Sequence, residues 1–134
     1  MSYEFADGYK IRDQSATYFL TFSIMGRIDI FSRQRYRDIL PDSLYFCREK
    51  KLLQSGAYVI MSNHMHVIWR AADNNISDII RDHKTFTSKA IITSIAAGPE
   101  SRRHWLLYGF RRWIRTLMGK ATSLIMDLEF MTRE

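Results

Sequence analysis

Two histidines, His64 and His66, flank a single methionine in the segment His64-Met65-His66. Successive side chains of a strand point to opposite faces, so a strand here places both imidazoles on one face and Met65 on the other. Two neutral ring nitrogens on one face can share a divalent cation, which can grip a phosphate oxygen and polarise the phosphorus toward attack. This spacing also occurs by chance in strands, so the surroundings of the pair decide its meaning.

The segments before the pair predict a strand and then a helix. Residues 17–24 are rich in aromatic and β-branched side chains, which favours a strand. Ser32 can cap a helix that starts at Arg33 and carries apolar residues at three- and four-residue steps. Pro41 lacks a backbone N–H, so we expect a kink or a restart of the helix there.

The segments around and after the pair predict a hairpin and a second helix. Residues 57–61 and 66–70 are two short β-type runs separated by a polar turn. Asn75 is a plausible cap for the next helix, which should stop at Gly98-Pro99. The order strand, helix, strand, strand, helix predicts an α+β fold, a ferredoxin-like split βαβ arrangement with an antiparallel sheet and helices on one face.

The C-terminal part is less regular than the rest. Residues 102–118 have a loose helical periodicity, and residues 122–131 are a weakly marked candidate for the edge strand that would complete the sheet. Residues 113–118 include an apolar group that fits either a homodimer interface or the edge of the core. Its members are Trp113, Ile114, Leu117 and Met118.

Composition and charge predict a single domain over residues 1–134 with a polyanionic partner. The chain is 46% hydrophobic and 25% charged, with a net charge of +6, and the region from Ser101 to Lys120 holds cations but no acidic residue. A basic folded domain favours nucleic acid, although a merely soluble basic surface is the alternative. The absence of a long apolar run predicts no membrane partner, and the single Cys47 favours the cytoplasm.

The hairpin AYVIMSNHMHVIWR, residues 57–70, resembles the signature hairpin of the HUH single-tyrosine transposases, particularly the REP-associated branch. YKIRDQSATYFLTFSI, residues 9–24, looks like the first strand of that family with its lead-in. SDIIRDHKTFTSK and ESRRHW look like its second helix and the continuation. The resemblance covers residues 9–105 and leaves residues 119–134 unmatched, as in a truncated or frame-disrupted copy.

The resemblance implies metal-assisted cleavage and rejoining of single-stranded or hairpin DNA through a covalent 5′-phosphotyrosine. His64 and His66 match the positions that hold Mg²⁺ or Mn²⁺ together with a polar third ligand. Tyr108 is the only tyrosine after the pair and is therefore the candidate nucleophile, with a packed or surface aromatic as the alternative. Its neighbours one turn later, Arg111 and Arg112, cannot ligate a cation.

Basic residues on and after the second helix are candidate contacts to the DNA backbone, although a solvated helix face explains them equally well. Three readings stay open: an active transposase, a catalytically dead DNA-binding remnant of the same fold, and an unrelated ferredoxin-like module with structural histidines. His83 is expected to be a core or rim histidine. The candidate DNA contacts are Arg81, Lys84, Lys89, Arg102 and Arg103.

Overall fold

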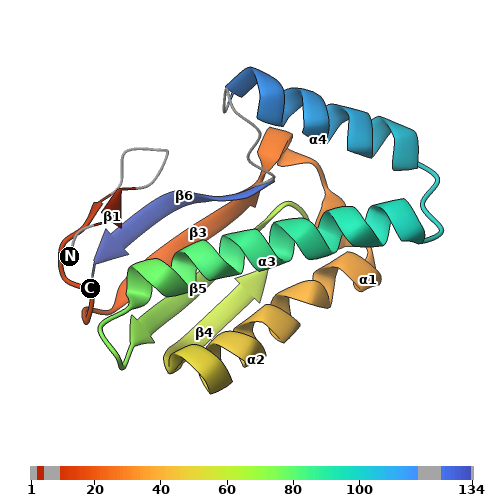
Figure 1. Cartoon of the computed structure of the whole chain (residues 1–134). Helices are drawn as coiled ribbons and strands as arrows, with labels where there is room; N and C mark the ends of the chain where they lie inside the picture. Colours follow the sequence, from red (N-terminus) through yellow and green to blue (C-terminus); the bar gives the residue numbers. More distant parts are fainter. Residues whose placement is uncertain (1–2, 5–9, 118–124, 134) are drawn as a thin grey trace.

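The chain forms one four-stranded sheet with helices packed on it (Figure 1). The computed structural model describes residues 3–4, 10–117 and 125–133, and the side chains of residues 11–111 and 125–133. The elements, with η for 3-10 helices, are β1 (Tyr3–Glu4), β2 (Lys10–Ile11), β3 (Tyr18–Ile24), η1 (Met25–Arg27), η2 (Ile30–Ser32), α1 (Gln34–Arg37), α2 (Ile39–Lys51), β4 (Leu53–Ile60), β5 (His64–Ala71), α3 (Ile76–Ala97), α4 (Arg103–Leu117) and β6 (Met126–Arg133).

The main sheet has the strand order β4-β5-β3-β6, and every neighbouring pair is antiparallel. The short strands β1 and β2 pair separately. This order is that of two interleaved split βαβ units, so the ferredoxin-like α+β prediction is confirmed. The weakly marked segment 122–131 does contribute the missing edge strand, which begins a few residues later than expected, at Met126.

The helices α2 and α3 cover one face of the sheet (Figure 1). The covered face carries alternate strand residues that are almost fully buried, as the period of two in a strand requires. Its members include Leu20, Phe22, Met65, Val67 and Trp69. The opposite face, which we call the open face, carries the residues in between and is where the histidine pair lies. Among the described helices, none has both the length and the apolar character to cross a membrane.

The first helical segment ends at Arg37 and the helix restarts at Ile39, two residues before Pro41, where we expected the kink or restart. Pro41 is the third residue of α2, where a backbone N–H has no intrahelical acceptor, so the proline costs the helix little. The prediction that Ser32 caps this helix is also wrong, because the Ser32 hydroxyl donates to the Asp29 carbonyl at 2.8 Å. Arg33 occupies the N-cap position of α1.

The start of α3 is capped from a distance. Asn75 is the N-cap residue as expected, but its side chain makes no capping bond and its Nδ2 donates to the Lys51 carbonyl at 3.3 Å. The backbone N–H of Ser77 donates instead to Gln14 Oε1 at 2.9 Å. A side chain from the β2–β3 connection therefore fixes the N-terminal end of α3.

A buried carboxylate, Glu100, holds the corner between α3 and α4 against α1. Tyr36 Oη donates to Glu100 Oε2 at 2.8 Å, and Arg33 and Arg35 lie 3.3 and 3.1 Å from the same oxygen. Arg102 donates to Oε1 through its backbone N–H and its Nε. Because these partners stabilise the charged form more than burial disfavours it, the pKa of Glu100 is lowered to about 2.

Candidate functional site

The pairing of β5 with β3 places both imidazoles on the open face. His64 is opposite Ser23 and His66 is opposite Thr21, whereas Met65 is opposite Phe22 on the covered face and is fully buried. The two imidazole centroids lie 4.8 Å apart with the rings inclined at 76°. The side-by-side arrangement that the spacing predicts is therefore present.

The hairpin turn before His64 is held in place by β3 and its continuation. The carbonyl of Asn63 accepts from the Ile24 N–H at 2.9 Å, and the Asn63 Nδ2 donates to the Arg27 carbonyl at 3.2 Å. The second bond fixes the orientation of the Asn63 amide, because only its nitrogen can donate. The Asn63 Oδ1 is consequently the atom that meets His64 Nδ1, at 2.7 Å.

Both rings are engaged through Nδ1, which leaves Nε2 for another partner. An amide oxygen only accepts, so His64 Nδ1 carries the proton and Nε2 keeps its lone pair. His66 Nδ1 lies 2.9 Å from the hydroxyl of Thr21, which can accept in the same way. A ring nitrogen fixed by a hydrogen bond at the other nitrogen is the usual form of a histidine ligand. The two residues thus fit a divalent cation.

The surroundings of His64 favour its neutral form. Burial, together with the nearby His66 and Arg27, lowers the pKa of His64. Ser23, the cross-strand neighbour of His64, donates to Glu129 on β6, and Glu129 also pairs with Arg27. Within the described part of the chain, however, no third His, Cys, Asp or Glu joins the pair in a metal-binding group.

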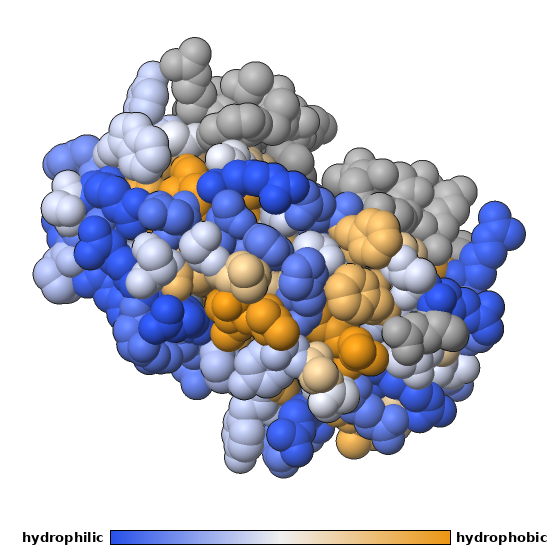
Figure 2. Space-filling model, turned by 180° about the vertical axis from the view of Figure 1, so that it is seen from behind, coloured by the Kyte–Doolittle hydropathy of each residue, from blue (hydrophilic) through white to orange (hydrophobic). Residues whose placement is uncertain are grey.

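An apolar hollow adjoins the pair on the open face. Phe19 stacks on His66 with centroids 5.5 Å apart at 22°, and Phe130 meets Phe19 edge-on at 6.2 Å. The hollow has a volume of about 110 Å³, and Val59 and Ile68 line it beside the rings of Phe19 and His66. Figure 2 shows apolar side chains gathered in the middle of the face turned away from the helices. Sequence reasoning missed this lining, because exposed apolar residues look like core residues in a sequence.

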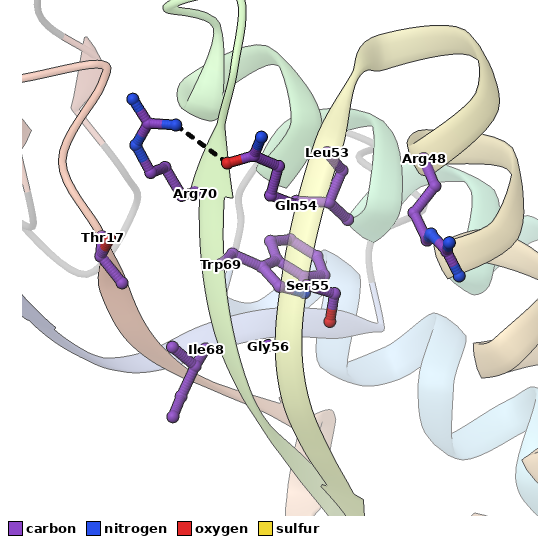
Figure 3. Close-up of a pocket in the computed structure, with 9 residues that line it drawn as sticks. All are labelled: Thr17, Arg48, Leu53, Gln54, Ser55, Gly56, Ile68, Trp69 and Arg70. Atoms are coloured by element: carbon purple, nitrogen blue, oxygen red, sulfur yellow. Dashed lines mark hydrogen bonds between the residues drawn. The ribbon is translucent and has the colours of Figure 1, made fainter.

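A larger hollow lies at the edge of the sheet, beside an irregularity in β4 between Ser55 and Tyr58 (Figure 3). Its volume is about 530 Å³, and Arg48 and Arg70 line it. Arg70 donates to Gln54 Oε1 at 2.9 Å. Neither histidine of the pair lines this hollow, so it is separate from the candidate metal site.

Tyr108, the expected nucleophile, lies on α4 with 65% of its surface exposed. It lines an open hollow formed only by residues of α4, and neither His64 nor His66 contributes to that hollow. The structure therefore brings the two histidines together but groups Tyr108 with a different surface.

The other two histidines lie apart from the pair. His83 is fully buried, with Nδ1 2.7 Å from the Ser43 hydroxyl, and its ring meets Trp69 and Phe22 edge-on. Burial lowers the pKa of His83 to about 3, so it is a neutral core residue. His104 is exposed on α4.

Among the candidate DNA contacts, Lys84 corrects the expectation of a solvent-facing cation. Its side chain is only 5% exposed, and its Nζ lies 2.6 Å from Asp127 Oδ1 on β6. A buried lysine must be paired, because an isolated ammonium group is costly to desolvate. Lys84 therefore joins α3 to the edge strand and is not available to a phosphate.

The remaining candidate DNA contacts differ in whether their charged groups already have partners within the protein. Arg102 pairs with Asp29 at 2.9 Å and with Glu100, and Arg103 donates to the carbonyls of Ile95 and Gly98. Arg81 pairs with Asp78 and Asp82 on its own helix. Lys89 is exposed. Arg102 and Arg103 thus have structural partners that the sequence did not reveal.

No family model and no curated protein sequence matches the chain. The solved structures that are similar to it include the following two. The first, a REP-associated tyrosine transposase bound to a REP hairpin, is 21% identical over 61% of this chain and 51% of its own, with a TM-score of 0.52. This chain spans about half the length of that transposase. The second, a Deinococcus radiodurans protein described as a transposase, is 13% identical over 73% of this chain and 89% of its own, also with a TM-score of 0.52. The chain therefore has the fold of a tyrosine transposase, as its hairpin led us to expect.

Proposed function

We propose that this chain is a transposase-like protein that acts on single-stranded or hairpin DNA with a divalent metal at His64 and His66. The observation that carries the proposal is the pair of imidazoles on the open face, each engaged at Nδ1 and without a hydrogen-bond partner at Nε2 among the described residues. The fold shared with a transposase bound to a DNA hairpin supports the choice of partner. A cytoplasmic location is part of the same proposal.

In this proposal the two histidines bind the metal and two neighbouring residues orient them. His64 and His66 would donate Nε2, while Asn63 and Thr21 keep the rings in the matching tautomer. The bound ion, Mg²⁺ or Mn²⁺, would neutralise a phosphate and polarise it. Two nitrogen ligands suit Mn²⁺ better than Mg²⁺, which prefers oxygen.

The cleavage step that the resemblance implies needs a tyrosine hydroxyl. Tyr108 Oη would attack the phosphorus and lose its proton to water while the bond from phosphorus to the 3′ oxygen breaks. The 3′ oxygen takes up a proton, and the 5′ phosphate stays on the tyrosine. An ordinary tyrosine hydroxyl with a pKa of about 10 is a weak nucleophile, so it would have to meet the phosphate beside the two imidazoles.

One observation favours the alternative, a DNA-binding remnant without cleavage. The hollow that Tyr108 lines contains residues of α4 alone. In this reading, the metal at the histidine pair would fix a DNA phosphate in place, and no bond would be broken.

Metal binding tests the central assignment without DNA. In a calorimetric Mn²⁺ titration, we expect the wild type to bind and the His64→Ala and His66→Ala variants to lose binding. His104→Ala is the matched control, because His104 is an exposed histidine outside the pair. Equal binding by the wild type and both pair variants would favour the third reading, a module with structural histidines.

Covalent trapping separates cleavage from binding alone. The protein is incubated with Mn²⁺ and a labelled single strand that carries a hairpin, and the adduct is sought on a denaturing gel. An adduct that His64→Ala and Tyr108→Phe both abolish supports the complete mechanism. DNA binding without an adduct supports the remnant. An adduct that survives Tyr108→Phe assigns the nucleophile to another residue.

A further inference from the structure

The helix α4 has one buried side and one exposed aromatic side. Leu106 and Phe110 are almost fully buried and attach the helix to the domain. Trp105 and Tyr108 are 61% and 65% exposed. They are three residues apart, so their Cβ atoms lie about 5–6 Å apart on one side of the helix. The packing of α4 therefore does not account for two of its largest side chains.

Cationic and polar groups flank these two rings. His104 and Arg111 line the same open hollow, which has a volume of about 540 Å³. Arg111 is exposed and has no ion-pair partner among the side chains that the structure describes. A surface that combines aromatic rings with a free guanidinium offers both stacking and charge to a ligand.

The positive charge of residues 101–120 favours a polyanionic partner. The sequence from Ser101 to Lys120 contains six cations and no acidic residue. The nearby acidic residues Glu100 and Asp29 are already engaged by Arg102. Among the described side chains, Arg111 places a positive charge on the exposed side of α4. This charge attracts a polyanion and disfavours a basic partner such as a second copy of this chain.

We propose that the exposed side of α4, formed by His104, Trp105, Tyr108 and Arg111, is a stacking surface for the bases of single-stranded nucleic acid. The inference rests on the DNA partner of the proposed function but concerns a surface separate from the histidine pair. Trp105 and Tyr108 each present a ring to one base, and Arg111 contacts the backbone. A single strand fits because its bases are free to stack on protein rings, whereas those of a duplex are already stacked.

The ring of Tyr108 contributes to this surface independently of its hydroxyl. The Tyr108→Phe variant removes the hydroxyl but keeps the aromatic face, so it should retain the affinity for a single strand. The Tyr108→Ala variant removes both and should not. This comparison separates stacking from the nucleophilic role, which needs the oxygen.

The test is fluorescence anisotropy with a labelled oligothymidylate and no added metal. We expect Trp105→Ala to weaken binding by at least about fivefold and Trp105→Phe to recover part of the loss. Tyr45→Ala is the matched control: Tyr45 is also 65% exposed but lies on α2, and its loss should leave binding unchanged. Arg111→Ala should reduce the slope of log affinity against log salt by about one, while Trp105→Ala should leave that slope unchanged.

Three outcomes overturn the inference. These are a wild type that does not bind the oligothymidylate, a Trp105→Ala variant that binds as well as the wild type, and an effect of Trp105→Ala only on the oligomeric state. The last outcome would assign the surface to a protein partner. None of them decides the metal proposal, which is judged by the Mn²⁺ titration without DNA.

Discussion

The hydroxyl of Thr21 offers a direct test of the proposed metal site. The Thr21→Val variant keeps the shape of this buried side chain but leaves His66 Nδ1 without its partner at 2.9 Å. A lost hydrogen bond of this kind costs about 1–1.5 kcal/mol, or roughly tenfold in affinity. Loss of a group that orients a histidine ligand costs about 10–100-fold. We therefore expect the Mn²⁺ affinity to fall by about tenfold, with the fold intact.

The assay is a calorimetric Mn²⁺ titration combined with ¹⁵N spectra of the imidazoles. In the wild type, we expect the His66 proton on Nδ1, and in Thr21→Val a shift toward the form with the proton on Nε2. Thr132→Val is the control, because Thr132 is exposed on the edge strand β6. If Thr21→Val changes neither the affinity nor the tautomer, Thr21 does not orient a ligand and the proposed arrangement of the site is wrong.

Three further predictions concern charges inside the protein. Glu100→Gln should cost about 3 kcal/mol of unfolding free energy at neutral pH, because the carboxylate pKa is about 2 in the folded chain against 4.5 unfolded. That contribution is complete above pH 4.5 and is lost as the pH falls toward 2, so urea titrations at several pH values should show a weaker acid dependence for Glu100→Gln than for an exposed control, Glu49→Gln. His83 stays neutral when folded but takes up a proton when unfolded, so the wild type should lose stability as the pH falls from 6.5 toward 3, and His83→Phe should flatten this part of the curve. Lys84→Ala should lower the unfolding free energy by about 3 kcal/mol because it breaks a buried ion pair, whereas Lys89→Ala on the same helix should change it by less than about 0.5 kcal/mol in urea denaturation.

The order of elements could be predicted because each strand and helix carries its own periodicity. The first strand, the hairpin and the end of α3 before Gly98 lie close to where the sequence placed them. The helix boundaries that depend on distant partners could not be predicted. Gln14 caps α3 across the fold, and no local pattern around Asn75 reveals that contact. The break at Asp38 was likewise misplaced, because the sequence does not show whether a proline stands in a first turn or in a helix interior.

In the candidate site, too, the local features could be predicted from the sequence and the contacts to distant residues could not. The spacing of His64 and His66 is enough to put the rings on one face, because strand alternation is local. Their partners are not predictable from spacing: Thr21 meets His66 only through strand register, and Asn63 is oriented by the carbonyl of Arg27. These contacts support the proposed cation site more strongly than the spacing of the two histidines does.

The distribution of cations moves the expected nucleic-acid surface away from the residues that the sequence suggested. Lys84 forms an ion pair with Asp127, and Arg102 forms ion pairs with Glu100 and Asp29. The positive charges of these two residues are therefore already balanced by carboxylates of the same chain. A phosphate that approached Lys84 or Arg102 would compete with the carboxylates that already pair with them and would gain little. Arg111 is exposed beside two solvent-facing rings and has no carboxylate partner among the described side chains, so in the proposed contact it would give up no such pair. Cations without a partner in the described part of the chain are therefore the first candidates for the proposed DNA contacts. The net charge is a weaker guide, because it counts paired and unpaired residues alike.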